Sequence, residues 1–145
     1  MFHNIFNIAA EAMSANRLRI NTIASNVANA QTTRTEEGGP YKRRDVVFAA
    51  TDVANDPFAS QLDRATLKGV RVAGVVADDS PPRMVYDPGH PDANPETGIV
   101  EMPNISPVTE MANLLSASAA YKAAAEVVNI SKSMAQVLRR LSQRF

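Results

Sequence analysis

The sequence predicts an α+β fold in which two long terminal α-helices form a coiled-coil-like pair beside a small β-rich, Pro-rich middle unit. Apolar residues recur every three or four positions over residues 1–33 and again over 105–145, the spacing of a helical stripe. Between these stretches, residues 34–104 carry turn residues and alternating valines. We therefore expect an N-terminal helix over 1–33, a β-rich unit with long loops over 34–104, and a C-terminal helix over 105–145 that pairs with the first.

Composition limits the class of protein. The 145 residues carry no net charge, which gives no sign of a nucleic acid or an anionic membrane as partner. The chain has no Cys, so disulfides and thiolate metal sites are excluded. No apolar run approaches the roughly 20 residues that span a bilayer. Asn4, Asn7 and Glu11 interrupt the N-terminal apolar residues, so we expect any export to proceed without a cleaved signal peptide.

The charges are unevenly distributed along the chain. Residues 1–33 hold only Glu11, Arg17 and Arg19, whereas residues 34–104 hold twelve carboxylates against eight basic groups. A helix that faces water normally carries charge on its open face. The sparse charge of both terminal stretches therefore indicates that water does not cover them in the working state.

The N-terminal stretch has clear helix signals. No Gly or Pro occurs from Met1 to Thr33, so nothing interrupts the helix early. Asn26 and Asn29 lie three positions apart on one face, and Asn tolerates the left-handed conformation that ends a helix. We expect these two amides to mark the helix end, with Thr32 and Thr33 leading into extended chain.

The middle stretch predicts short strands. A turn at Gly38-Gly39-Pro40 precedes a candidate strand over 41–48, and a turn is predicted over 55–57. A stronger strand covers 68–77, where Val70, Val72 and Val76 are expected on one face. Residues 83–86 could return as its partner. Seven of the nine prolines lie between positions 81 and 107, so we expect neither a helix nor a central strand there.

The basic run Lys42-Arg43-Arg44 has two interpretations. It is either a solvated strand edge or a contact with an acidic neighbour.

The C-terminal helix has the best-defined start. Ser106 is a good N-cap, Pro107 suits the first helical position, and Glu110 favours the positive end of the helix dipole. No further Gly or Pro follows up to Ser142, which gives a helix of roughly 54 Å at 1.5 Å per residue. Its apolar face is broader than one partner helix requires. The two helices could form a closed hairpin within one monomer, or pack against copies of themselves in an assembly.

We predict helix-packing and polymer-interface positions along both stripes. They are Ile5, Met13, Ile20, Ile23, Val27, Met111, Leu114, Leu115, Tyr121, Val128, Met134 and Leu138. In an isolated subunit the two helices meet along one seam only, so several apolar side chains would stay exposed to water. Examples are Ile5, Leu18, Leu115, Val127 and Val137. We therefore expect both terminal helices to be only partly ordered in dilute solution and to become fully helical when neighbours cover them.

A catalytic or metal site has little support in the sequence. Asp87, His90 and Asp92 offer three ligands, but their spacing fits no strong metal motif. The alternative function is a small periplasmic metal-binding or hydrolytic module that uses the 87–96 loop. Phosphate-binding, dinucleotide-binding and zinc-protease motifs are all missing. We expect no enzyme activity, no cofactor, no metal and no small-molecule substrate.

Residues 25–32 resemble the "SN-hydrophobic-ANxxT" signature of the flagellar axial proteins, the rod and hook family. The residues that carry this signature are Ser25, Asn26, Val27, Ala28, Asn29 and Thr32. Stretches 37–48, 69–75, 80–93, 100–105 and 108–111 are similar to the proximal rod subunits within that family. One stretch departs from it: relatives usually carry Arg, Glu or Gln, and Asn where this chain has Ala119, Lys122 and Ala124.

The resemblance implies a structural subunit of the bacterial flagellar basal body. Such a subunit is exported by the flagellar type III apparatus and polymerises helically into the proximal rod in the periplasm. It links the MS ring and export gate to the distal rod and transmits torque. Its implied partners are copies of itself, other rod proteins and the junction proteins of the MS ring and export gate, with no nucleic acid. Its terminal helices would line the inner layer of the tube, with the β unit outside.

Overall fold

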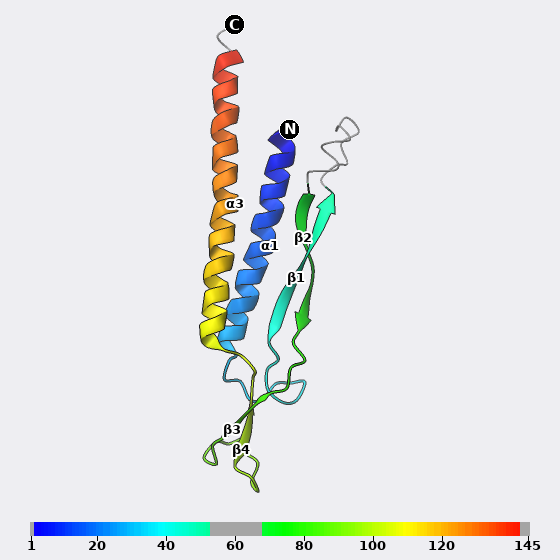
Figure 1. Cartoon of the computed structure of the whole chain (residues 1–145), viewed down its shortest axis with the longest axis vertical. Helices are drawn as coiled ribbons and strands as arrows, with labels where there is room; N and C mark the ends of the chain where they lie inside the picture. The colour runs from blue at the N-terminus through cyan, green and yellow to red at the C-terminus, as the bar shows by residue number, and fades with distance from the viewer. Residues whose placement is uncertain (1, 53–67, 143–145) are drawn as a thin grey trace.

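The computed structural model describes residues 2–52 and 68–142 and confirms the predicted α+β class (Figure 1). The turn predicted over 55–57 lies outside these residues. The elements are α1 (Phe2–Ala28), β1 (Arg44–Asp52), β2 (Lys68–Ala77), β3 (Arg83–Tyr86), β4 (Ile99–Met102) and α3 (Pro107–Ser142).

Helix α1 is the central element of the molecule. It contacts α3 along one side and the β1–β2 ribbon along another (Figure 1). The two helices run antiparallel, and α3 has 36 residues against 27 in α1, so α3 extends past the N-terminus of its partner. The β3–β4 hairpin lies at the opposite end of the long axis, beyond the start of α3 (Figure 1).

The strand predicted over 68–77 is confirmed, but its partner is β1. The two strands pair antiparallel from Arg44↔Ala77 to Asp52↔Lys68, with a β-bulge between Val47 and Phe48. The candidate strand over 41–48 was wrong in its bounds, because β1 begins at Arg44 and ends at Asp52. The bulge shifts the register, so Val46 is buried but Phe48 is not. Val76, expected on the same face as the half-buried Val70 and Val72, is also exposed because it lies near the end of the ribbon.

The middle of the chain forms two separate sheets rather than one unit. Strand β3 pairs with β4 and not with β2, in the register Val85↔Val100. Pro81 and Pro82 lie between β2 and β3 and cannot donate backbone hydrogen bonds, which stops the first ladder. The strand β4 lies in the Pro-rich stretch, for which we predicted no helix and no central strand. As one of two paired strands it has a free edge, which such a stretch tolerates.

The start of α3 was predicted correctly, but the end of α1 was not. Helix α3 begins as expected, because the Thr109 amide donates to Ser106 Oγ at 3.4 Å and the Glu110 amide to the Ser106 carbonyl at 3.0 Å. Helix α1 ends at Ala28, before the predicted boundary at Thr33. The prediction that Asn26 or Asn29 adopts the left-handed conformation was wrong. Among the described residues only glycines have positive φ, and Asn26 ends the helix through contacts distant in sequence.

Small side chains bring the elements close together. Ala9 and Ala15 of α1 and Ala117 of α3 are buried, together with Ile23. Since α3 packs mainly against α1, the completely buried Ala117 lies at the seam between the two helices. A larger residue at that position has no space without a shift of one helix.

Ala117→Leu should therefore destabilise the isolated chain by about 1–3 kcal/mol, the usual cost of overpacking a well-packed core. Chemical denaturation of the purified protein measures the loss. Ala120→Leu is the matched control, because Ala120 lies on the exposed side of the same helix. Equal stability of the two variants would show that the seam has room for a larger side chain.

Candidate functional site

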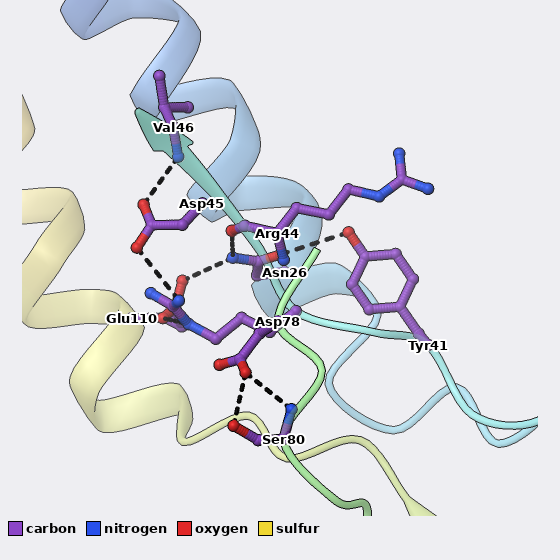
Figure 2. A network of polar contacts seen from close by, with 9 residues as sticks. Asn26, Tyr41, Arg44, Asp45, Val46, Asp78, Ser80 and Glu110 are labelled. Atoms are coloured by element: carbon purple, nitrogen blue, oxygen red, sulfur yellow. Dashed lines mark hydrogen bonds and ion pairs between the residues drawn. The ribbon is translucent and has the colours of Figure 1, made fainter. Parts of the chain in front are cut away.

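The family signature lies where three elements meet. The end of α1, the segment entering β1 and the start of α3 are joined by Asn26, Tyr41, Arg43, Arg44 and Glu110, which we call the polar junction (Figure 2). Asn26 and Glu110 are both almost completely buried. Buried polar groups of this kind are costly unless they are hydrogen-bonded, so their partners decide what the junction does.

Asn26 uses both ends of its amide. Its Nδ2 donates to the Arg44 carbonyl at 2.8 Å and to Glu110 Oε2 at 3.0 Å. Its Oδ1 accepts from the Arg44 amide at 2.9 Å and from the Tyr41 hydroxyl at 3.3 Å. The side chain thus pairs with both backbone groups of Arg44, as a neighbouring strand would. This contact fixes the first residue of β1 against the last turn of α1.

Glu110 is the acidic centre of the junction. Its Oε1 accepts from Arg43 Nε at 2.9 Å, while Oε2 accepts from Asn26. Arg43 also donates to Asp45 at 3.2 Å (Figure 2). Burial lowers the pKa of Arg43, but the hydrogen bonds and charges of Glu110 and Asp45 outweigh burial and raise the pKa above its ordinary value. The junction is therefore a paired and hydrogen-bonded ionic site rather than a lone buried charge.

One further backbone contact attaches the β1–β2 ribbon, and two carboxylates beside it form local hydrogen bonds. The Asp78 amide donates to the Arg43 carbonyl at 2.7 Å, so the chain leaving β2 stays beside the chain entering β1. Asp78 Oδ1 accepts from the Ser80 hydroxyl and the Ser80 amide, and these bonds lower the pKa of Asp78 (Figure 2). Asp45 Oδ1 accepts from the Val46 amide at 2.8 Å.

The other signature residues close the helix end locally. Asn29 Nδ2 donates to the Ser25 carbonyl at 2.9 Å, and Asn29 Oδ1 accepts from Thr32 Oγ1 at 3.1 Å. The Ser25 hydroxyl lies 3.3 Å from the Tyr41 hydroxyl. Val27 is half-buried and Ala28 is exposed. Asn26 therefore makes the long-range contacts, whereas Asn29 acts on the backbone of its own turn.

The acidic 87–92 segment is used for a different contact. Asp92 accepts from Thr33 Oγ1 at 2.7 Å and forms an ion pair with Arg34. His90 Nδ1 accepts from the Asp92 amide at 3.1 Å. Within residues 2–52 and 68–142, no three His, Asp or Glu side chains lie close enough together to hold a metal ion. The segment joins the β3–β4 hairpin to the end of α1.

Thr33→Val should raise the pKa of Asp92. The hydrogen bond from Thr33 is the main cause that holds this pKa below its ordinary value of 3.8, with Arg34 and His90 adding to it. A lowered folded-state pKa stabilises above the ordinary value, and that contribution disappears as pH falls through the folded pKa. Without the hydroxyl, less stability is lost on acidification, and the loss is complete at a higher pH. Carboxyl NMR titration measures the pKa, and Thr109→Val, distant from Asp92, is the control. An unchanged Asp92 titration would contradict the assignment.

The predicted packing positions fall into three exposure classes. Ile23 is buried. The half-buried positions are Ile5, Met13, Ile20, Val27, Leu114, Tyr121 and Val128. The exposed positions are Met111, Leu115, Met134 and Leu138. Leu18, Val127 and Val137, which we expected one seam to leave wet, are exposed as well, while Ile5 is partly covered.

Sequence reasoning missed Tyr41 and the buried role of Glu110. In the sequence Glu110 looks like an ordinary carboxylate in the first turn of a helix. Its partner Asn26 is 84 positions away, so no local pattern indicates their contact. Of the two interpretations of the basic run, contact with acidic groups applies to Lys42 and Arg43, and the acidic groups belong to this chain. Lys42 pairs with the exposed Asp79 and Arg43 with Glu110. Arg44 instead lies over the Tyr41 ring.

Neither of the two described helices combines the length and the apolar character needed to cross a membrane.

Known proteins match this chain over most of its length. The family described as flagella basal body rod protein matches residues 6–34, which include the signature and Asn26. The family described as flagellar basal body rod FlgEFG protein C-terminal matches residues 96–141, which include Glu110 and nearly all of α3. The two matched segments thus supply the two buried partners of the junction.

Individual relatives can be aligned with nearly the whole chain. The flagellar basal-body rod protein FlgC of Borreliella burgdorferi is 43% identical over 137 residues, covering 88% of this chain and 89% of its own. The protein of the same name from Salmonella typhimurium is 43% identical, and that from Escherichia coli O6:H1 is 41% identical, each covering 90% of both chains. These matches extend across the Pro-rich middle as well as the helices. The chain therefore belongs to the flagellar basal-body rod protein FlgC family.

Proposed function

We propose that this chain is a structural subunit that polymerises helically into the proximal rod of the bacterial flagellar basal body. In this role it links the MS ring and export gate to the distal rod and transmits torque. The observation that carries the proposal is the likeness to rod proteins named FlgC over about nine tenths of the chain. The alternative of a metal-binding or hydrolytic module is not supported, because Asp92 and His90 serve structural contacts.

The surface of α3 supports assembly on physical grounds. Val108, Met111 and Leu115 are exposed near its start, and Ile130, Met134 and Val137 near its end, with Leu115 at 72%. A helix of a finished monomer normally covers its apolar residues. Burying each such side chain stabilises by roughly 1.5–3 kcal/mol, so neighbours that cover this surface would contribute strongly to a polymer.

The polar junction supports a role in transmitting force. It ties both helix ends to the strand β1 through buried hydrogen bonds and one buried ion pair. Buried and fully satisfied networks fix one arrangement of the elements around them. A torque applied to the helices would therefore pass to the β ribbon without a change of angle between them.

The proposed partners follow from the role. They are copies of this chain, other flagellar rod proteins, the junction proteins of the MS ring and export gate, and the flagellar type III export apparatus. The proposed location is the periplasmic part of the basal body. The role is structural and requires no catalysis, cofactor or metal.

Gene deletion tests this proposal against a soluble coiled-coil adaptor that never forms a tube. Cells without the gene should lack complete basal bodies and motility, and the full-length gene should restore both. Basal bodies isolated from the restored cells should contain the chain. Cells that still build flagella after deletion would exclude the rod assignment.

Hydrogen exchange on a verified monomer tests how far the helices depend on neighbours. We expect faster exchange in both terminal helices than in residues 68–86, with protection in α3 falling with distance from the junction because its distal apolar residues are exposed. In isolated rods the same amides should become protected. Strong protection of both helices along their whole length in the monomer would instead establish a closed hairpin.

A further inference from the structure

A groove lies on the outer face of the β3–β4 hairpin. The strand register places Met84, Tyr86, Ile99 and Glu101 on one face, opposite the buried Val100. Between this face and residues 33–40 lies a cavity of about 520 Å³, with Met84 and Ile99 among its apolar lining and Glu101 and Thr33 among its polar lining. Tyr86, beside it, is 74% exposed. A hairpin of a monomer does not need an apolar outer face.

The groove end of the molecule is acidic. Residues 83–102 contain Asp87, Asp92, Glu96 and Glu101 against a single Arg83. Asp92 is already paired with Arg34, whereas Glu101 has no hydrogen bond or ion pair through its side chain to any described residue. A mixed groove in which Met84 and Ile99 lie beside the unpaired carboxylate of Glu101 fits a partner that is apolar and basic.

The far end of α3 has the matching character. Residues 127–142 contain Lys132, Arg139 and Arg140 and no carboxylate. Lys132 and Arg140 are exposed. The exposed apolar side chains of this segment recur at helical spacing and form one stripe, at Val127, Ile130, Met134, Val137 and Leu138. The last part of this segment extends past the N-terminus of α1, where no other described element covers it (Figure 1), whereas Ser131 is buried and Val128 is half-buried.

We propose that the β3–β4 groove of one copy binds the distal α3 segment, residues 127–140, of a second copy. This inference rests on the proposed rod function and names one contact within the polymer. The two surfaces lie at opposite ends of the long axis, so they cannot meet within one chain (Figure 1). A head-to-tail contact between two different surfaces does not close on itself, and its repetition produces an open helical filament.

Charge and shape set the orientation of this contact. Met134 and Val137 contact Met84 and Ile99 in the groove, and Arg140, one helical turn after Val137, pairs with Glu101. Opposite charges at the two ends favour head-to-tail pairing, and they disfavour pairing of two acidic ends or two basic ends. The same chain thus carries both halves of a polar contact.

Cysteine cross-linking tests the contact, because the natural chain has no Cys. One cell produces two full-length single variants, Met84→Cys and Val137→Cys, and isolated basal bodies are oxidised. We expect a covalent dimer at least tenfold more abundant than with Met84→Cys and Leu115→Cys. Leu115 is the control because it is apolar and 72% exposed but lies near the other end of α3. Equal yields, or cross-linking of Met84→Cys only to a different rod protein, would overturn the inference.

Charge exchange provides the second measurement. Glu101→Lys and Arg140→Glu should each reduce the amount of chain in isolated basal bodies by on the order of tenfold, since like charges then face each other. The two changes together should restore assembly, and unfolding midpoints of all three variants should match the natural chain. If basal bodies form without the chain, the proposed function fails. If the chain is present but neither cross-link nor charge rescue occurs, only this contact is wrong.

Discussion

Replacing Asn26 with Asp should destabilise the subunit by about 3–5 kcal/mol, the range seen when a buried charge loses its proper partner. The amide now donates to the Arg44 carbonyl and to Glu110 Oε2. A carboxylate would remove both donors and place a second negative charge about 3 Å from Glu110, where burial leaves little solvent to separate the charges. The new carboxylate would also lie at the negative end of the α1 dipole.

The pH dependence of this variant gives a sharper test than its stability alone. Two buried carboxyl groups in contact share a proton, so one of them has a raised pKa in the folded state. A raised folded-state pKa means that the variant is relatively more stable below it and loses stability as pH rises through it. We therefore expect the difference between Asn26→Asp and the natural chain to be smaller at pH 5 than at pH 8.

Two other Asn residues of the same region serve as comparisons. Asn29→Asp removes the local bond to the Ser25 carbonyl and should cost only about 1–2 kcal/mol, the loss of one hydrogen bond plus a dipole effect. Asn21→Asp, on the exposed side of α1, should have almost no effect. In cells, Asn26→Asp and Asn29→Asp should impair rod assembly more than export. Equal urea midpoints for the three variants, or normal motility of both Asn26→Asp and Asn29→Asp, would contradict a structural role for the signature.

Local signals in the sequence predicted the elements whose cause is local. The start of α3 follows from one hydroxyl and one proline, Ser106 and Pro107, and both act on the backbone next to them. The strand over 68–77 follows from alternating valines along one stretch. Neither required knowledge of what lies beside the element in space.

The remaining features depend on distant partners. The two Asn that we expected to mark the helix end lie at the end of α1, although neither is left-handed. Asn29 bonds the backbone of its own turn, but Asn26 acts on Arg44 and Glu110, which no local pattern indicates. The separation of the middle unit into two sheets depends on which strands pair, and alternation alone does not specify a partner. Glu110 looked like an ordinary dipole partner because burial is decided by packing.

The ion pair between Arg43 and Glu110 should show strong energetic coupling. Glu110→Ala and Arg43→Ala should each destabilise by about 3–5 kcal/mol, because each leaves its buried or partly buried partner without its main counter-charge. The double variant should cost less than the sum of the two, with a coupling energy of roughly 1–3 kcal/mol. Glu110→Gln should also destabilise, since its amide would point a donor at either Asn26 or Arg43.

The neighbouring pair between Lys42 and Asp79 is the matched control for that cycle. It comes from the same basic run but is solvent-exposed on both sides. Exposed pairs contribute at most about 1 kcal/mol, so Lys42→Ala and Asp79→Ala should be nearly additive and weak. Urea unfolding of both sets of variants at one pH and salt concentration gives the two coupling energies. Similar values for the buried and the exposed pair would mean that burial adds nothing to the junction, and that the angle between the helices and the β ribbon is held by apolar packing instead.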